Sequence, residues 1–358
     1  METGKPRRGM TPLHFVDDEW LALRTEDVLE PERPIVDAHH HIWEGHQHHT
    51  YLVPDLLEDL HCGHNIRGTV YVECSFMYRA DGDPRFASIG EVEYANGVAA
   101  AFASGRYGDV RACAGIVGKV DLTLGAMAQP VLEAAMARAP DRFRGIRHML
   151  AWDASPEVNL LRKPPVKDLM LDPSFRLGFA QLGKLGLSFD AWCYHPQLPQ
   201  LIGLVDENPD TRVIVDHVGG KAGTGPYAAR KDETFRDWKR SMQELARRPN
   251  VFCKLGGLNM RLNGFDFIDR DLPPTSSQLA TAWRPLVETC IELFGPGRCM
   301  FESNFPPDKA GCSARVLWNT FKRLASGHSE DEKAALFAGT AIRAYRLPES
   351  LGTPAPAS

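Results

Sequence analysis

Short apolar runs alternate with longer amphipathic stretches along most of the chain, and this alternation indicates the class of fold. Eight runs have the length and apolar content of strands, namely PIVDAHH at 34–40, GTVYVEC at 68–74, ACAGIVG at 112–118, FRGIRHM at 143–149, LSFDAWC at 187–193, RVIVDHV at 212–218, NVFCKLG at 250–256 and RCMFES at 298–303. Helical patterns lie between these runs, and several end in Gly or Asn-Pro, as helices commonly do. Alternating strands and helices imply a parallel sheet with right-handed crossovers, and eight such units predict a closed (β/α)8 TIM barrel.

An open, doubly wound sheet is the rival arrangement for the same alternation. That fold would carry a glycine-rich phosphate loop after an early strand. The sequence contains neither a GxGxxG pattern nor a Walker pattern. The alternation therefore favours the barrel.

The barrel is expected to span residues 34–347, with a flanking segment on each side. Residues 1–33 are polar and contain Pro12 and Pro31, so we expect an N-terminal arm that lies on the domain. Two helical patterns follow the last strand, ARVLWNTFKRLASG and EDEKAALFAGTAIRAYRL, which predicts an extra C-terminal helix. We expect residues 348–358 to form a disordered tail.

The composition is that of an ordinary packed protein, and it excludes some partners. Apolar residues make up 43% of the 358 positions and charged residues make up 24%, as in ordinary globular proteins. The net charge is -5 and the sequence contains no block of basic residues, so nucleic acid is not an expected partner. No segment approaches the ~18 uncharged apolar residues of a membrane span. The eight cysteines include no Cys-x-x-Cys pair, which favours reduced thiols in a cytoplasmic protein. A homo-oligomer is compatible with this composition.

Polar residues gather where the predicted strands end. In a (β/α)8 barrel these ends meet at one mouth, where active sites lie. The residues at or just beyond the ends of the runs are His39, His41, Glu73, Arg147, His148, His195, His217, Lys254, Glu302 and Asn304. We therefore expect these side chains to share one site at that mouth.

The pair His39 and His41 is the strongest metal-binding signal. Side chains two residues apart on a strand share a face, so both imidazoles can bind one ion from the same side. Zinc favours nitrogen ligands of this kind. The alternative is a histidine-rich surface loop, because His46, His48 and His49 follow, but the apolar strand before the pair favours a site.

Other residues at the mouth have structural alternatives. His195 and His217 each precede a turn, where a single histidine is often only structural. Arg147 suits a substrate carboxylate because its planar guanidinium matches that group, but it also suits an internal ion pair. Lys254 could offset charge that develops on an oxyanion, or it could neutralise a neighbouring carboxylate.

These stretches resemble the amidohydrolase-related family of metal-dependent TIM-barrel hydrolases, especially its sugar lactonases and the lactonases of aromatic-pathway metabolism. The matching segments are IVDAHHHIWE, FRGIRHML, FDAWCYHPQLPQL, VIVDHVGG, VFCKLGGL, MFESNFPPDK and GTAIRAYRL, which together cover about residues 34–347. The resemblance implies that His39, His41, His195 and His217 bind or replace a divalent metal. It also implies that Arg147 faces the substrate. Similar proteins differ in metal use, and some hydrolyse lactones without a metal.

The last strand departs from the family pattern. The family usually has Gly-Ser-Asp-Trp-Pro, whose aspartate is a metal ligand and general base, whereas this chain has Glu-Ser-Asn-Phe-Pro with Asn304 at the aspartate position. An amide can neither take up a proton as a carboxylate does nor bind a hard cation as well. Glu302 shares the strand face of Asn304 and could supply the carboxylate instead. Glu73 and Asp308 are other candidates, and the alternative for Glu302 is a buried salt bridge with Lys254 or Arg147.

These observations predict a lactonase-type hydrolase that cleaves a C–O bond in a small carboxylated cyclic ester. The predicted catalytic residues are His195, Lys254, Glu302 and Asn304, the substrate-binding residues are Glu73, Arg147 and His148, and one divalent metal, zinc before others, is expected at the four histidines. A metal-free site is the alternative for the cofactor. A decarboxylase of the same superfamily and a barrel that binds ligand without turnover are the alternatives for the function.

Overall fold

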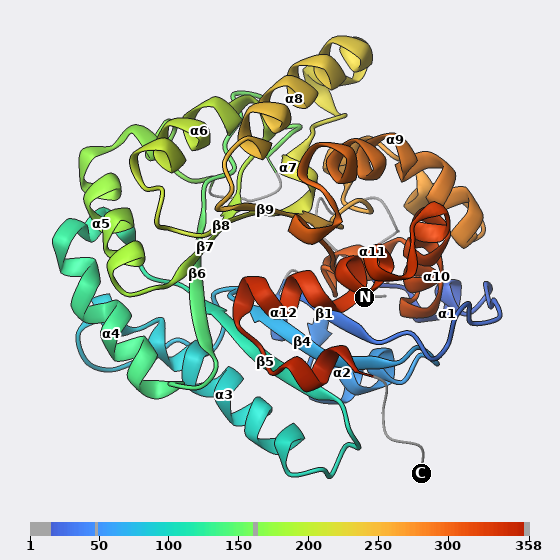
Figure 1. The fold of residues 1–358 in the computed structure, drawn as a ribbon, viewed down its shortest axis with the longest axis horizontal. Coiled ribbons are helices and arrows are strands. Elements are labelled where there is room, and N and C mark those ends of the chain that lie inside the picture. Colours follow the sequence, from blue (N-terminus) through green and yellow to red (C-terminus); the bar gives the residue numbers. More distant parts are fainter. Residues whose placement is uncertain (1–15, 47–48, 160–163, 354–358) are drawn as a thin grey trace, which may run out of the picture.

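The computed structural model describes residues 16–46, 49–159 and 164–353, and it shows the barrel that the sequence predicts (Figure 1). Eight strands run parallel in the order β1-β4-β5-β6-β7-β8-β9-β10. They are β1 (Ile35–His40), β4 (Ile66–Val72), β5 (Arg111–Gly118), β6 (Phe143–Met149), β7 (Ser188–Trp192), β8 (Val213–Val215), β9 (Val251–Leu255) and β10 (Cys299–Phe301). The first and last strands meet where the Asn304 N–H donates to the His39 carbonyl over 2.9 Å and the His41 N–H donates to the Phe305 carbonyl over 2.8 Å.

Helices surround this sheet and bury its outer face (Figure 1). They are α1 (Asp18–Leu21), α2 (Val53–Leu60), α3 (Ile89–Ala103), α4 (Ala128–Arg138), α5 (Pro173–Lys184), α6 (Leu198–Glu207), α7 (His217–Gly220), α8 (Lys231–Ala246), α9 (Ser276–Phe294), α10 (Ala314–Leu324), α11 (Glu330–Ala334) and α12 (Thr340–Tyr345). Caps explain several of their starts, since Asp172 accepts from the Phe175 N–H and Ser313 accepts from the Val316 N–H. In the part of the chain that the structure describes, no helix is both long and apolar enough to cross a membrane.

The extra C-terminal helix α12 closes the amino-terminal end of the barrel. Its Ala341 and Tyr345 pack in one buried cluster with strand residues that include Val36, Val70 and Ile214. The Tyr345 hydroxyl also reaches the barrel interior, where it donates to Asp190 Oδ2 over 2.7 Å. The C-terminal helix is therefore part of the interior rather than an addition to the surface.

Two predicted strands end earlier than their apolar runs. Strand β8 stops at Val215 because His217 and Val218 adopt left-handed backbone angles, with φ of 53° and 48°. Strand β10 stops at Phe301, and Asn304 beyond it has φ of 50°. Non-glycine residues in this region are uncommon and cluster at functional sites. Both turns carry residues that the sequence assigns to the mouth.

The segments outside the predicted strands contain more regular structure than expected. His46 and His49, which we expected in a loop, pair in an antiparallel hairpin of β2 (Trp43–His46) and β3 (His49–Tyr51), and His48 lies outside the described residues. In the predicted arm, the Trp20 indole N–H donates to the Arg270 carbonyl over 3.1 Å. In the predicted tail, Glu349–Gly352 form a 3-10 turn, and residues 354–358 lie outside the described part.

Candidate active site

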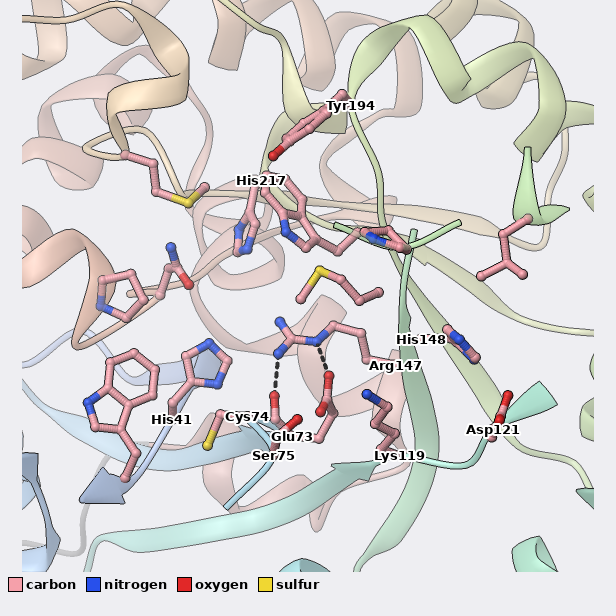
Figure 2. A pocket seen from close by; sticks show the side chains of 18 of the residues that line it. His41, Glu73, Cys74, Ser75, Lys119, Asp121, Arg147, His148, Tyr194 and His217 are labelled. Atoms are coloured by element: carbon pink, nitrogen blue, oxygen red, sulfur yellow. Dashed lines mark hydrogen bonds and ion pairs between the residues drawn. The ribbon is translucent and has the colours of Figure 1, made fainter. Parts of the chain in front are cut away.

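A cavity of about 550 Å³ opens at the carboxyl ends of the strands (Figure 2). Its polar lining comes from several strand ends and the loops after them: His41, Glu73, Ser75, Lys119, Asp121, Thr123, Arg147, His148, Tyr194, His217 and Asn304. Apolar and aromatic residues complete the wall, among them Trp43, Leu169, Trp192 and Met260. A concave site of this size with a few converging polar groups is typical of small-molecule binding.

The His39 and His41 imidazoles meet at the floor of this cavity. Their Nε2 atoms lie 3.2 Å apart, and the Nδ1–H of His41 donates to the Val72 carbonyl over 2.8 Å. That hydrogen bond fixes the His41 tautomer, so Nε2 of His41 carries no proton where it faces Nε2 of His39. Burial lowers the pKa of both histidines well below its usual value, with help from Lys254 at His39 and from Arg147 at His41. Both rings are therefore neutral at neutral pH and able to donate a lone pair.

Glu302 is fully buried beneath the cavity and contacts two imidazoles. The His217 Nδ1–H donates to Glu302 Oε1 over 2.7 Å, and His39 Nδ1 lies 3.0 Å from Oε2. The alternative expected from the sequence was a salt bridge from Glu302 to Lys254 or Arg147. Among the described residues, the ion pairs of Glu302 within 4.0 Å join it to His39 and His217 instead. Because Glu302 binds the ring side that faces away from the cavity, it directs the Nε2 atom of His217 towards the cavity.

Lys254 lies in the same buried layer and is surrounded by carboxylates. Its ammonium is 2.6 Å from Asp190 Oδ2, 3.1 Å from Asp216 Oδ1 and 3.1 Å from His39 Nδ1. The two aspartates raise the pKa of Lys254 above its usual value, although burial alone would lower it. This arrangement matches the alternative in which the lysine neutralises neighbouring carboxylates. Lys254 does not belong to the cavity lining formed by the described residues.

Arg147 is tied to Glu73 on the cavity wall. Its Nε donates to Glu73 Oε1 over 2.9 Å, and its Nη2 donates to the Glu73 carbonyl (Figure 2). Its Nη1 lies 3.5 Å from His39 Nε2. The guanidinium is thus paired internally on one side and directed at the histidines on the other.

Asn304 lies at the cavity beside a second buried carboxyl group. Its Nδ2 donates to Asp308 Oδ1 over 3.2 Å, and the Asn259 N–H donates to Asp308 Oδ2 over 3.3 Å. Burial raises the pKa of Asp308 to about 7. The structure thus places a carboxyl group next to the position where the family has its aspartate, but one helical turn further along the chain.

The remaining two predicted histidines differ in position. His148 lines the cavity, and burial lowers its pKa to about 4. His195 lies apart from the histidine cluster, where its Nδ1 accepts from the Ala222 N–H over 3.2 Å and its ring packs on Tyr227. In the described lining its neighbour Tyr194 faces the cavity instead (Figure 2). The role predicted for His195 stays a prediction.

Sequence analysis missed Asp216, which the structure places with the histidines. One ligand atom each from His39, Asp216 and His217 lies within 4.8 Å of the others. Both Asp216 oxygens are buried without a hydrogen-bond partner among the described residues, although Oδ1 forms the ion pair with Lys254. The adjacent pair Asp-His in VIVDH was the available signal, because either residue could turn inward where the strand ends.

A barrel with its cavity at this mouth places the protein among the (β/α)8 enzymes. A profile of the family described as Amidohydrolase matches residues 36–347. The chain therefore belongs to the amidohydrolase family, and it is an enzyme of the amidohydrolase superfamily.

Relatives in sequence agree with this assignment, and a solved structure agrees with the fold. An uncharacterized protein of Sinorhizobium fredii, y4mH, is 30% identical over 87% of this chain and 98% of its own length. An L-fucono-1,5-lactonase of Burkholderia multivorans is 27% identical over 66% of this chain and 72% of its own length. A crystal structure of an amidohydrolase from Burkholderia multivorans with bound zinc has a TM-score of 0.67 and 24% identity, and the match covers 88% of this chain and all of that one.

Proposed function

We propose that the protein hydrolyses the C–O bond of a small lactone. The observation that carries the proposal is the floor of the cavity, where the neutral imidazoles of His39 and His41 converge beside Nη1 of Arg147. Ester hydrolysis requires a group that activates the attacking water and a positive charge that stabilises the carbonyl oxygen as it becomes negative. The sequence similarity to an L-fucono-1,5-lactonase supports the same reaction class.

The donor set at the floor fits a divalent metal. The imidazoles of His39 and His41, with Nε2 atoms 3.2 Å apart, and a third imidazole in His217 offer nitrogen ligands, while the buried carboxylate of Asp216 lies 3.8 Å from the other ring nitrogen of His39, Nδ1. We propose zinc, which favours this chemistry and is bound by the Burkholderia amidohydrolase. The family resemblance also implies His195, but its ring lies on Tyr227 away from these imidazoles, so we propose His39, His41 and His217 as the nitrogen ligands. A bound metal would lower the pKa of a water molecule and polarise the lactone carbonyl.

The chain's own residues orient this chemistry. Arg147 is held by Glu73, so its Nη1 is fixed where it can donate to the lactone carbonyl oxygen and stabilise the charge that develops there. Glu302 accepts a hydrogen bond from the Nδ1–H of His217, and its other oxygen lies 3.0 Å from Nδ1 of His39, so it holds both imidazoles from below. Glu302 thus provides the carboxylate that Asn304 cannot provide, but it acts through the rings rather than as a base on water.

The test begins with the purified native protein. Its metal content is measured by elemental analysis, and acid release from a panel of γ- and δ-lactones is followed before chelation, after chelation and after zinc is restored. We expect about one metal per chain and activity that follows the metal, with His39→Ala and His41→Ala each losing both. Full activity in chelator from a protein without stoichiometric metal would refute the metal. Release of bicarbonate from aromatic acids without lactone hydrolysis would favour the decarboxylase alternative.

We also propose that the enzyme works in the cytoplasm on a small molecule. All eight cysteines are free, and six of them are buried, which suits a reducing compartment. Cell fractionation with a thiol-labelling assay checks this expectation. Complete disulfide formation in the isolated protein would contradict it.

A further inference from the structure

Lys119 is a charged group in the cavity that the proposed mechanism does not use. It follows directly after β5, at the carboxyl end of the barrel, and its side chain lines the cavity (Figure 2). Among the described residues, none of the ion pairs within 4.0 Å involves its ammonium. The other fixed cation of the lining, Arg147, already has Glu73 as its partner. Lys119 is therefore a cation of the described lining that has no ion-pair partner within 4.0 Å.

The neighbouring polar groups have their own hydrogen-bond partners. Asp121 Oδ1 accepts from the Thr123 N–H over 3.0 Å and from the Thr123 hydroxyl over 2.6 Å, so this carboxylate caps its own turn. Glu73 Oε1 accepts from Arg147. His148 is neutral at neutral pH because its pKa is lowered to about 4. An anionic group of a ligand would therefore give Lys119 the close partner that the described side chains do not provide.

We infer that Lys119 binds a carboxylate of the substrate and so selects acidic lactones over neutral ones, an inference that rests on the proposed lactonase function. Figure 2 shows Lys119 on the side of the cavity with Asp121 and His148, whereas His41 and His217 lie on the other side. A cyclic ester bound between the two sides places its ester at the histidines and its carboxylate at Lys119. The structure thus gives Lys119 the anchoring role that the sequence suggested for Arg147.

The test compares matched substrates on variants of the holoenzyme. The acidic probe is 5-oxotetrahydrofuran-2-carboxylate, and the neutral probe is its carboxamide, which has the same ring and ester. We expect Lys119→Met to reduce kcat/KM for the acid by about 10-fold to 100-fold, mainly through KM, and to change kcat/KM for the amide by less than about 3-fold. Lys119→Arg should keep most of the preference for the acid. Lys184→Met, which removes an exposed lysine near the end of α5, is the matched control for the loss of one positive charge.

A binding measurement separates this inference from the proposed reaction. Tetrahydrofuran-2-carboxylate and its carboxamide have no ester, so calorimetry on these two compounds reports recognition without turnover. Weaker binding of the carboxylate alone by Lys119→Met supports the role of Lys119, even if no lactone is hydrolysed and the proposed function fails. Equal losses for acid and amide, or the same loss in Lys184→Met, would overturn the assignment of Lys119.

Discussion

Two sets of polar residues lie inside the barrel, and they are satisfied in different ways. The inner layer consists of Asp190, Asp216, Lys254 and Glu302, all fully buried. The cavity layer consists of His41, Arg147, His217 and Asn304, all of which line the cavity. In the inner layer charges face opposite charges or imidazoles within about 3 Å and have no surface in the cavity, whereas the side chains of the cavity layer form part of the cavity wall.

The difference shows how a buried charge network can serve a site that it does not enter. Glu302 has no surface in the cavity, yet it fixes the ring of His217, which does. Groups behind a ligand commonly orient it and tune its basicity. Substitutions in the inner layer should therefore mainly lower the free energy of unfolding or displace the imidazole rings. Substitutions in the cavity layer should mainly reduce substrate binding or turnover.

The largest expected effect is on stability, from Lys254→Met. The change leaves Asp190 and Asp216 buried without their cation, and breaking a buried charge network in this way costs ~3–5 kcal/mol. Urea unfolding measures the loss of unfolding free energy. The double variant with Asp190→Asn should recover part of it, since it removes one of the stranded charges. A single variant as stable as the wild type would show that the inner layer is not held by this lysine.

Glu302→Gln should cost turnover more than stability. An amide oxygen can still accept from His217, but the negative charge that lies 3.0 Å from Nδ1 of His39 is lost, so that ring loses an electrostatic partner. Loss of such a supporting group typically reduces activity or metal affinity by ~10-fold to 100-fold. Kinetics together with metal titration measure both. If Glu302 were instead the base, kcat would fall at every metal concentration, and added zinc would restore nothing.

Asp308→Asn should flatten the dependence of stability on pH. The folded pKa of about 7 lies above the usual value, so between about pH 4 and pH 7 the folded protein binds more protons at this group than the unfolded chain does. Its contribution to stability is therefore present at low pH and lost as the pH rises to about 7, by at most about 1.4 kcal/mol per pH unit. Thermal unfolding of both proteins from pH 4 to pH 8 measures the difference. Parallel curves would refute it.

The smallest expected effect comes from His195→Ala. The family resemblance predicts loss of metal, but the ring lies on Tyr227 and accepts from the Ala222 N–H, away from the histidine cluster. Because of this position we expect the His195→Ala variant to keep the wild-type metal content. Its kcat/KM should change by less than about 3-fold, which is small for a residue at an active site. Metal analysis of the variant decides between the two expectations. Loss of the ion would place His195 in the site after all.

The sequence predicted the architecture because alternation is a local property of the chain. Each strand has its own apolar pattern, and eight strands that alternate with helices predict the closed barrel. The same local pattern predicted that His41, His148 and Arg147 lie at the mouth, and all three line the cavity, while their roles stay predictions. It was less informative past the ends of strands, where alternation stops. Strand β7 ends at Trp192, so the direction of His195 was set by a 3-10 turn that its sequence did not specify.

The inner layer was harder to predict for a different reason. Asp190 and Asp216 lie in the predicted strands, but nothing in either strand shows that Lys254 will face both. That meeting depends on the register between three strands, which the packing of the whole barrel fixes. The hairpin Trp43–Tyr51 escaped prediction because its residues are polar and lack the apolar alternation of a strand.

The hydroxyl of Tyr345 connects the last helix of the chain to a buried carboxylate inside the barrel. Asp190 belongs to β7, near the middle of the chain, while the phenol that donates to it belongs to α12, after every strand. Asp190 also pairs with Lys254, so the phenol is a second partner of this carboxylate, and loss of α12 would remove a hydrogen bond worth about 1–3 kcal/mol. The last helix thus contributes to the charge network inside the barrel as well as covering it.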